Sequence, residues 1–270
     1  ATSCGSARPN QLERHVKVTP KTEQYHLHGR VVTPGLVDPH THLIFAGSRE
    51  KEFALRAAGR PYLDILAEGG GILSTVQATR AAGEDELVQL ALARLNRFLT
   101  YGVTTVEAKS GYGLSLEHEL KILRATYRTG ELHPVRLVPT FLGAHAVPAE
   151  YRGRKAAYVR HVVDDVLPAV ATERLAEFCD AYLEQGAFSL ADARRILGAA
   201  KELGLRPRMH AGQFHDLGGP QLAARLGASS ADHLEEISPA GIRAMAKGNV
   251  VAVLLPGAAL SLGQTPPDAR

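Results

Sequence analysis

The chain has 270 residues, of which 45% are hydrophobic and 22% charged, a composition typical of a folded α/β protein with a large core. The formal net charge is only +3, and basic residues are interspersed with acidic ones, which argues against nucleic acids and membrane surfaces as partners. Two cysteines, Cys4 and Cys179, are too few for a disulfide framework or a cysteine-based zinc site, and they favour a cytoplasmic location.

Apolar, strand-like runs alternate along the chain with amphipathic stretches of helical length, the pattern of βα units around a parallel sheet. The expected strands are 35–38, 104–109, 136–141, 176–180, 206–210, 228–232 and 250–255. The expected helices include 84–99, 116–129, 190–203, 218–226 and 239–247. Ser189 and Ser238 precede two of these helices and can cap them. Seven strands predict a (β/α)8 TIM barrel that lacks its last unit.

The first strand leads into two histidines, His40 and His42. Residues i and i+2 of a strand point to the same side, so both rings can reach one metal ion. An isolated His-x-His is more often a pair of ordinary core or surface histidines. This pair, however, follows the carboxyl end of an apolar strand, where the active sites of barrels are built.

Other polar residues also fall at or just after strand ends: Glu107, Lys109, Tyr112, His145, His210 and His233. A barrel brings these ends to one rim, so His40, His42 and His210 can surround one metal ion. Imidazole-rich sites suit zinc or iron, and we expect one such ion per chain. An open coordination position would lower the pKa of water toward about 7, which makes hydroxide available at neutral pH.

Five blocks of the sequence point to one family. They are His40-Thr-His-Leu-Ile-Phe-Ala-Gly-Ser-Arg-Glu-Lys-Glu-Phe53, Gly69-Gly-Gly71, Lys109-Ser-Gly-Tyr-Gly-Leu114, Gly143-Ala-His145 and Asp232-His-Leu-Glu-Glu236. From about Gly29 onward the chain resembles the imidazolonepropionases of the amidohydrolase superfamily. The resemblance implies a role in histidine degradation, in which water opens the ring of 4-imidazolone-5-propanoate to give N-formimidoyl-L-glutamate. It also implies a homodimer.

The resemblance implies a role for each candidate residue. It makes His40, His42 and His210 the metal ligands, and it makes Tyr112 and His145 substrate-binding residues. Arg49 would clamp the propionate group of the substrate, for which a guanidinium fork is well shaped. Without the resemblance, we would interpret Arg49 as a solvated surface residue and Tyr112 as a turn residue.

Two further residues are implied to act near the chemistry. His233 would help to activate or orient the attacking water. Gln213 stands where some family members carry a glutamate that contacts the substrate and assists proton transfer. An amide cannot be that base, so Gln213 is a substrate contact at a catalytic position. Lys109 invites comparison with the carbamylated lysine of binuclear amidohydrolases, but we expect it to pair with Glu107 instead.

The sequence departs from the family in one motif. The family places an aspartate ligand in a Thr/Ser-Asp-Phe-Asn-Pro motif after strand 8, and this sequence contains no such motif. We therefore expect a truncated form, with 1–34 the remnant of an N-terminal β-rich segment and 35–270 an incomplete barrel. The alternatives are another cyclic-amide hydrolase or deaminase of the superfamily, or a catalytically silent form.

Overall fold

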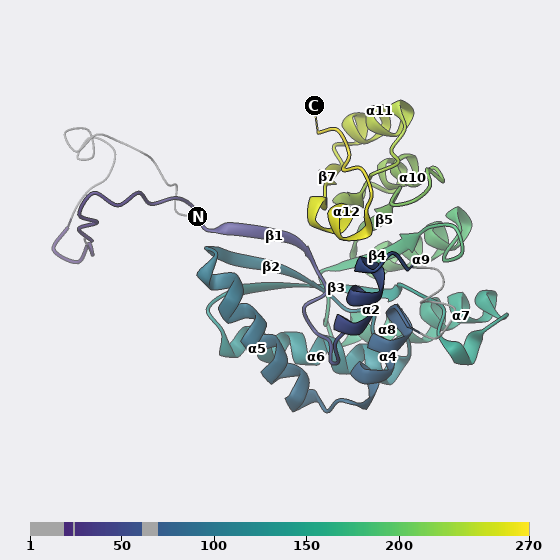
Figure 1. The fold of residues 1–270 in the computed structure, drawn as a ribbon, viewed down its shortest axis with the longest axis horizontal. Coiled ribbons are helices and arrows are strands. Elements are labelled where there is room, and N and C mark those ends of the chain that lie inside the picture. Colours follow the sequence, from purple (N-terminus) through teal and green to yellow (C-terminus); the bar gives the residue numbers. More distant parts are fainter. Residues whose placement is uncertain (1–18, 24, 61–69, 270) are drawn as a thin grey trace.

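The computed structural model describes residues 19–23, 25–60 and 70–269. Within them, seven parallel strands pair in chain order, β1-β2-β3-β4-β5-β6-β7, and curl into a nearly closed barrel (Figure 1). The predicted TIM-barrel class with seven strands is confirmed. Most of the predicted N-terminal segment, residues 1–18 and 24, lies outside the described part of the chain, and the domain division at residue 34 stays a prediction.

The strands form where the apolar runs predict them. They are β1 (Leu36–Thr41), β2 (Val103–Lys109), β3 (Arg136–Ala144), β4 (Phe178–Leu183), β5 (Arg206–Ala211), β6 (Ser230–His233) and β7 (Val251–Val253). From the sequence we expected His40 to follow the first strand. Because β1 runs on to Thr41, His40 lies inside the strand instead. Parallel pairing places His210 of β5 beside Tyr182 of β4 on one side and Asp232 of β6 on the other.

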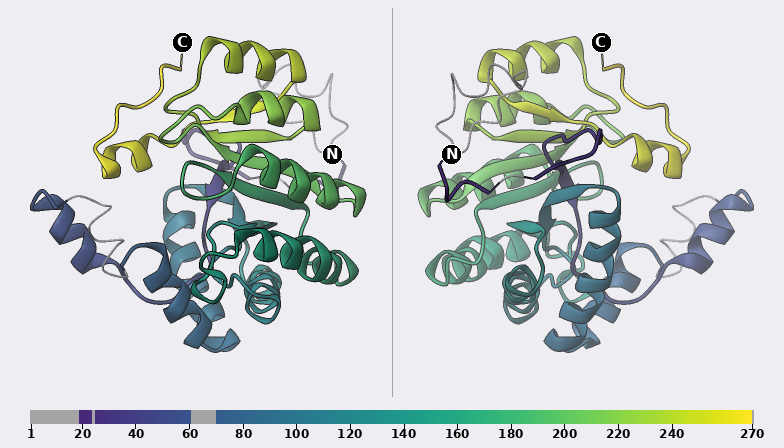
Figure 2. Two further views of the ribbon diagram at one scale, coloured as in Figure 1. Left: turned by 90° about the vertical axis from the view of Figure 1, so that its right-hand side faces the viewer. Right: turned by 90° about the vertical axis from the view of Figure 1, so that its left-hand side faces the viewer.

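Helices surround the strands on the outside, following the chain from blue to yellow (Figure 2). The predicted helices are found as α5 (Glu84–Thr100), α6 (Leu116–Leu132), α9 (Leu190–Glu202), α10 (Gly219–Leu226) and α11 (Pro239–Gly248). The structure adds α2 (Glu50–Ala57), α4 (Ile72–Ala81), η1 (Ala149–Tyr151), α7 (Lys155–His161), η2 (Val162–Val166), α8 (Leu167–Thr172) and α12 (Pro256–Leu262). In the described residues, no helix is both long and apolar enough to cross a bilayer.

Side-chain hydrogen bonds cap the first turns of several helices, and apolar packing holds the helices against the strands. Ser189 and Ser238 cap α9 and α11 as predicted, and Ser189 forms a reciprocal capping box with Asp192. Between the helices and the strands lies an apolar layer that includes Leu95 of α5 and Ile122 of α6, both without exposed surface. The carboxyl ends of the strands, by contrast, are rich in buried charged groups.

Candidate active site

Histidine rings from four segments gather at the carboxyl ends of the strands. The ring centroid of His40 lies 4.6 Å from that of His210 and 5.2 Å from that of His233. His42 stacks on His145 with ring centroids 4.8 Å apart and an interplanar angle of 14°. The five histidines singled out from the sequence therefore form one cluster, although 193 positions separate the first from the last.

The cluster contains an arrangement that can hold a metal ion. His40, His210 and His233 each offer a ligand atom, and these atoms all lie within 4.8 Å of one another. The predicted ligand His42 borders this group, with its ring centroid 5.5 Å from that of His40 and 5.6 Å from that of His210. Its Nδ1 atom is buried and has no hydrogen-bond partner. His233 thus joins the three predicted ligands at one place.

Two carboxylates fix the orientation of the histidines. Asp232 Oδ2 lies 2.7 Å from His40 Nδ1, and Asp180 Oδ2 lies 2.9 Å from His210 Nδ1. His40 Nδ1 donates its proton to Asp232, because an ionised carboxylate can only accept, and its Nε2 is left with its lone pair. Asp180 also accepts a 3.0 Å hydrogen bond from the backbone N–H of His210. Carboxylates commonly orient metal-binding histidines in this way. Sequence reasoning missed both aspartates, although each ends or nearly ends an expected strand.

Lys109 joins the two aspartates beneath the histidines. Its Nζ atom lies 2.7 Å from Asp180, 2.8 Å from Glu107 and 3.3 Å from Asp232. Burial opposes the charge of Lys109, but the three carboxylates outweigh it and raise the pKa of the amine. The predicted pairing with Glu107 is confirmed. A fully buried ammonium group held by three carboxylates is not available for carbamylation, which requires the neutral amine.

Four histidines of the cluster have lowered pKa values, which favour their neutral forms. Burial lowers the pKa of His40, His42 and His210, and the positive charge of Lys109 lowers it further in each case. Burial also lowers the pKa of His145, to about 3, with His210 as the next cause. Neutral imidazoles offer lone pairs, which both metal ligands and proton acceptors require.

A cavity of about 560 Å³ adjoins the cluster. Its lining includes Phe45, Ser48, Arg49, Glu50, Arg94 and Tyr112. The Tyr112 ring is 5.5 Å from His42 and 5.4 Å from His145, so this residue connects the cavity to the histidines. Arg49 is exposed and directly precedes α2. The structure therefore brings the predicted residues Arg49 and Tyr112 to one cavity.

The two remaining candidates are held by hydrogen bonds. His145 Nδ1 lies 3.0 Å from Gly111 O. A carbonyl only accepts, so Nδ1 donates and Nε2 keeps the lone pair. Gln213 follows β5, and its Oε1 accepts a 2.9 Å hydrogen bond from the hydroxyl of Tyr182, whose ring is 5.8 Å from His210. Gln213 therefore lies near the cluster with a fixed side-chain oxygen.

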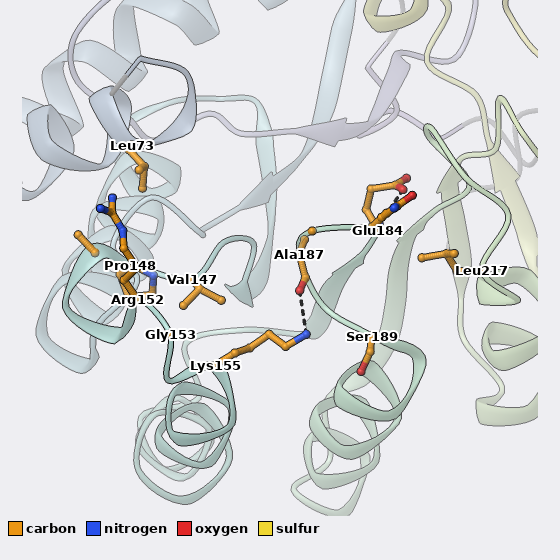
Figure 3. A pocket seen from close by; sticks show the side chains of 13 residues that line it. Leu73, Val147, Pro148, Arg152, Gly153, Lys155, Glu184, Ala187, Ser189 and Leu217 are labelled. Carbon is orange, nitrogen blue, oxygen red and sulfur yellow. Dashed lines mark hydrogen bonds between the residues drawn. The ribbon is translucent and has the colours of Figure 1, made fainter. Parts of the chain in front are cut away.

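A second cavity, of about 490 Å³, opens on the same side between the segments that follow β3 and β4 (Figure 3). Val147 and Lys155 line one part of it and Glu184 another, and Lys155 Nζ donates to Ala187 O at 3.2 Å. Glu184 also accepts a 2.7 Å hydrogen bond from His215 Nδ1. None of these residues was a candidate from the sequence.

Comparison with known proteins finds relatives that share most of this sequence. It is 57% identical over 249 residues to imidazolonepropionase from Myxococcus xanthus, covering 92% of this chain. It is 52% identical over 242 residues to imidazolonepropionase from Shouchella clausii, covering 90% of this chain. Over about nine tenths of its length, the chain is therefore similar to imidazolonepropionases. It spans 59% and 54% of the length of these two relatives. No family model matches the chain.

Solved structures agree with the fold. The 5-methylcytosine deaminase from Klebsiella pneumoniae, liganded with 5-fluorocytosine, is 14% identical with a TM-score of 0.64, covering 90% of this chain and 60% of that one. An adenosine deaminase from Xanthomonas campestris with bound zinc is 16% identical with a TM-score of 0.53, covering 86% and 51%. At these identities, the likeness of the chain to the deaminases concerns the fold alone.

Proposed function

We propose that this protein hydrolyses 4-imidazolone-5-propanoate to N-formimidoyl-L-glutamate, the reaction for which its relatives are named. The observation that carries the proposal is the single cluster of His40, His42, His145, His210 and His233, next to a cavity lined by Arg49 and Tyr112. These are the residue types that a metal-dependent hydrolase of an anionic cyclic substrate needs.

The donor set fits one zinc or iron ion. His40 Nδ1 donates to Asp232, which leaves Nε2 to bind. His210 Nδ1 lies 2.9 Å from Asp180, and His42 has a buried nitrogen without a hydrogen-bond partner. We propose that these three residues hold the ion, with His233 beside it. Such an ion, when bound, would act as a Lewis acid that makes water a stronger nucleophile at neutral pH.

The substrate's two ends have matching groups on the protein. The propionate would pair with the guanidinium of Arg49 in the cavity of about 560 Å³, with the Tyr112 hydroxyl as a further donor. The ring would then lie beside His42 and His145, whose centroids are 5.5 and 5.4 Å from that of Tyr112. This placement holds the ring carbonyl next to the histidine cluster.

The reaction needs groups that hold protons at defined atoms. The oxygen of water bonds to the ring carbonyl carbon, the bond from that carbon to the ring nitrogen breaks, and the nitrogen takes up a proton. His233 would orient the water and receive its proton. His145, neutral with a free Nε2 lone pair, would accept a hydrogen bond from a ring N–H, and the Gln213 amide would hold the substrate without serving as a base.

The decisive experiment is formimidoylglutamate production from freshly generated 4-imidazolone-5-propanoate by the purified 270-residue chain. His210→Ala serves as the matched variant, because it removes a proposed ligand that is buried in the cluster. We expect metal-dependent turnover that the variant loses. A folded, metal-loaded chain without turnover would exclude enzymatic activity of this chain and support the silent form.

A change of substrate within the same fold is the alternative, suggested by the deaminases that share the architecture. Arg49 and Tyr112 argue against it, because a neutral base needs no guanidinium clamp. A panel of cytosine, adenine and cyclic amides tests this alternative through ammonia release or ring opening. We also propose a cytoplasmic homodimer, which light scattering on the purified chain and fractionation of cells test.

A further inference from the structure

We propose that Glu119 is a positioning residue for the substrate, which acts by holding the turn 110–114 in the shape that presents Tyr112 and orients His145. The inference rests on the proposed function, because it concerns the substrate side of the same site. Glu119 belongs to the first turn of α6 and is only 1% exposed. Its hydrogen bonds within the described residues go to the turn and not to the histidine cluster, so its influence passes through the backbone of the turn.

The carboxylate of Glu119 accepts hydrogen bonds from several backbone amides. Its Oε1 atom accepts hydrogen bonds from the N–H groups of Gly113 at 2.8 Å and Leu114 at 2.7 Å, and its Oε2 atom accepts one from Gly111 at 3.1 Å. The hydroxyl of Ser110 is a fourth partner. Among the described residues no salt bridge to Glu119 is formed, so its buried charge is balanced by the donors of this turn.

The turn 110–114 is packed so closely that its two glycines, Gly111 and Gly113, have no room for a side chain. Gly111 has φ +101°, and a Cβ there would lie 2.8 Å from Leu142 O and 2.9 Å from His145 Nδ1. A Cβ on Gly113 would lie 2.5 Å from Glu119 N. The two glycines therefore let the turn approach α6 and His145.

Two proposed substrate-binding residues, His145 and Tyr112, depend on the backbone of the turn 110–114. Gly111 O accepts the 3.0 Å hydrogen bond from His145 Nδ1, which selects the tautomer with a free Nε2. Tyr112 lies between Gly111 and Gly113, and Glu119 accepts hydrogen bonds from the backbone N–H groups of both glycines. Displacement of the turn would therefore move the Tyr112 ring in the cavity and release the ring of His145.

The test compares Glu119→Gln with Glu117→Gln, which makes the same exchange at an exposed position two residues earlier on α6. A glutamine side chain has one acceptor oxygen, so it cannot serve amides on both sides of Tyr112. Three quantities are measured for each protein: hydrogen exchange in peptides that contain 110–114, bound metal, and the dissociation constant for 3-(imidazol-4-yl)propanoate. This probe carries an imidazole ring and a carboxylate and needs no turnover.

For Glu119→Gln we expect faster exchange in 110–114, unchanged bound metal and a dissociation constant raised about tenfold. Glu117→Gln should match the wild type in all three. Where Glu119→Gln does not fold, Glu119→Asp carries the test, because it keeps the charge but withdraws it from the amides by one methylene group. Its exchange and dissociation constant should rise in the same direction.

The outcomes separate this inference from the proposed function. Faster exchange with unchanged ligand affinity would make Glu119 a structural residue and overturn the inference alone. Loss of metal together with ligand would place its effect in the histidine cluster, which also overturns it. A wild-type chain that neither binds the probe nor produces formimidoylglutamate would overturn the proposed function and the inference with it.

Discussion

The hydrogen bond between Asp232 and His40 makes a prediction at the scale of one residue. Asp232→Asn keeps the size of the side chain but removes the charge that fixes the proton on Nδ1. We expect the affinity for Zn²⁺ to fall about 10- to 100-fold, as is usual when the partner of a metal-binding histidine is changed. Competition with a coloured chelator measures it.

Asp192→Asn is the control for this change, because Asp192 belongs to the capping box of α9 and interacts with Ser189 and Lys155. Its affinity for Zn²⁺ should equal that of the wild type. Equal affinities for all three proteins would show that His40 needs no carboxylate or that it is not a ligand.

A second residue-scale prediction concerns pH. The pKa of His145 is about 3 in the folded protein because of burial, against about 6.5 in an unfolded chain. Between these values the unfolded state binds a proton that the folded state does not, so the free energy of unfolding falls as the pH falls through this window. Denaturant unfolding of metal-free protein between about pH 7 and about pH 4 measures the fall.

His145→Gln is the comparison, since glutamine can still donate to Gly111 O but does not titrate. The loss of stability on acidification should be smaller in this variant than in the wild type. Parallel curves for the two proteins would show that His145 protonates equally well in both states.

The histidines of the site could be identified from the sequence, but their carboxylate partners could not. His40 and His42 stand out because a strand places i and i+2 on one side, and the family blocks mark the rest. Asp180 and Asp232 owe their roles to pairing between strands and to contacts across the barrel, such as the one that joins His40 to a residue 192 positions later. No local pattern carries that information.

At the scale of elements, the connection from β2 to α6 gives a matched pair of glycine substitutions. Gly113→Ala places a methyl group 2.5 Å from Glu119 N, and overpacking of this kind destabilises a protein by about 1–3 kcal/mol. Gly198→Ala, inside α9, meets nothing within 4 Å, and alanine is the better helix former by about 1 kcal/mol. We expect opposite changes in the free energy of unfolding, measured by urea denaturation.

Only Gly113→Ala should also weaken binding of the imidazole-propanoate probe, because its effect falls on the turn that carries Tyr112. Equal stability of the two variants would contradict the prediction that the turn packs too closely against α6 to accept a methyl group.

The strands were predictable because the interior strands of a parallel barrel are buried on both sides and read as short apolar runs. The segment α7–η2–α8 was not predicted as helix. It contains five β-branched valines, which favour strands locally: Val159, Val162, Val163, Val166 and Val170. Its middle turn is a π-helix that breaks the regular period. Packing of Val162, Val166 and Leu167 into the core decides the structure there.

At the scale of the whole molecule, polar contacts join strands that the sheet does not pair. β1 and β7 are the two edges of the described sheet, and β1 has hydrogen-bonded strand contacts only with β2. Across the interior, His40 of β1 bonds to Asp232 of β6, and Arg208 of β5 donates to Pro39 O at 2.8 Å. The site therefore holds the first strand of the barrel to the later ones.

Metal should consequently stabilise the whole chain and not only the site. An ion held by His40 and His210 would tie β1 to β5, and a ligand that binds only the folded state adds about 2.7 kcal/mol at a hundredfold excess over its Kd. We expect Zn²⁺ to raise the midpoint of thermal unfolding by roughly 5 °C over protein treated with chelator, measured by calorimetry. In His210→Ala the midpoint should no longer respond to Zn²⁺. A rise of equal size in the variant would place the stabilising ion elsewhere on the molecule, because β5 would then contribute no ligand.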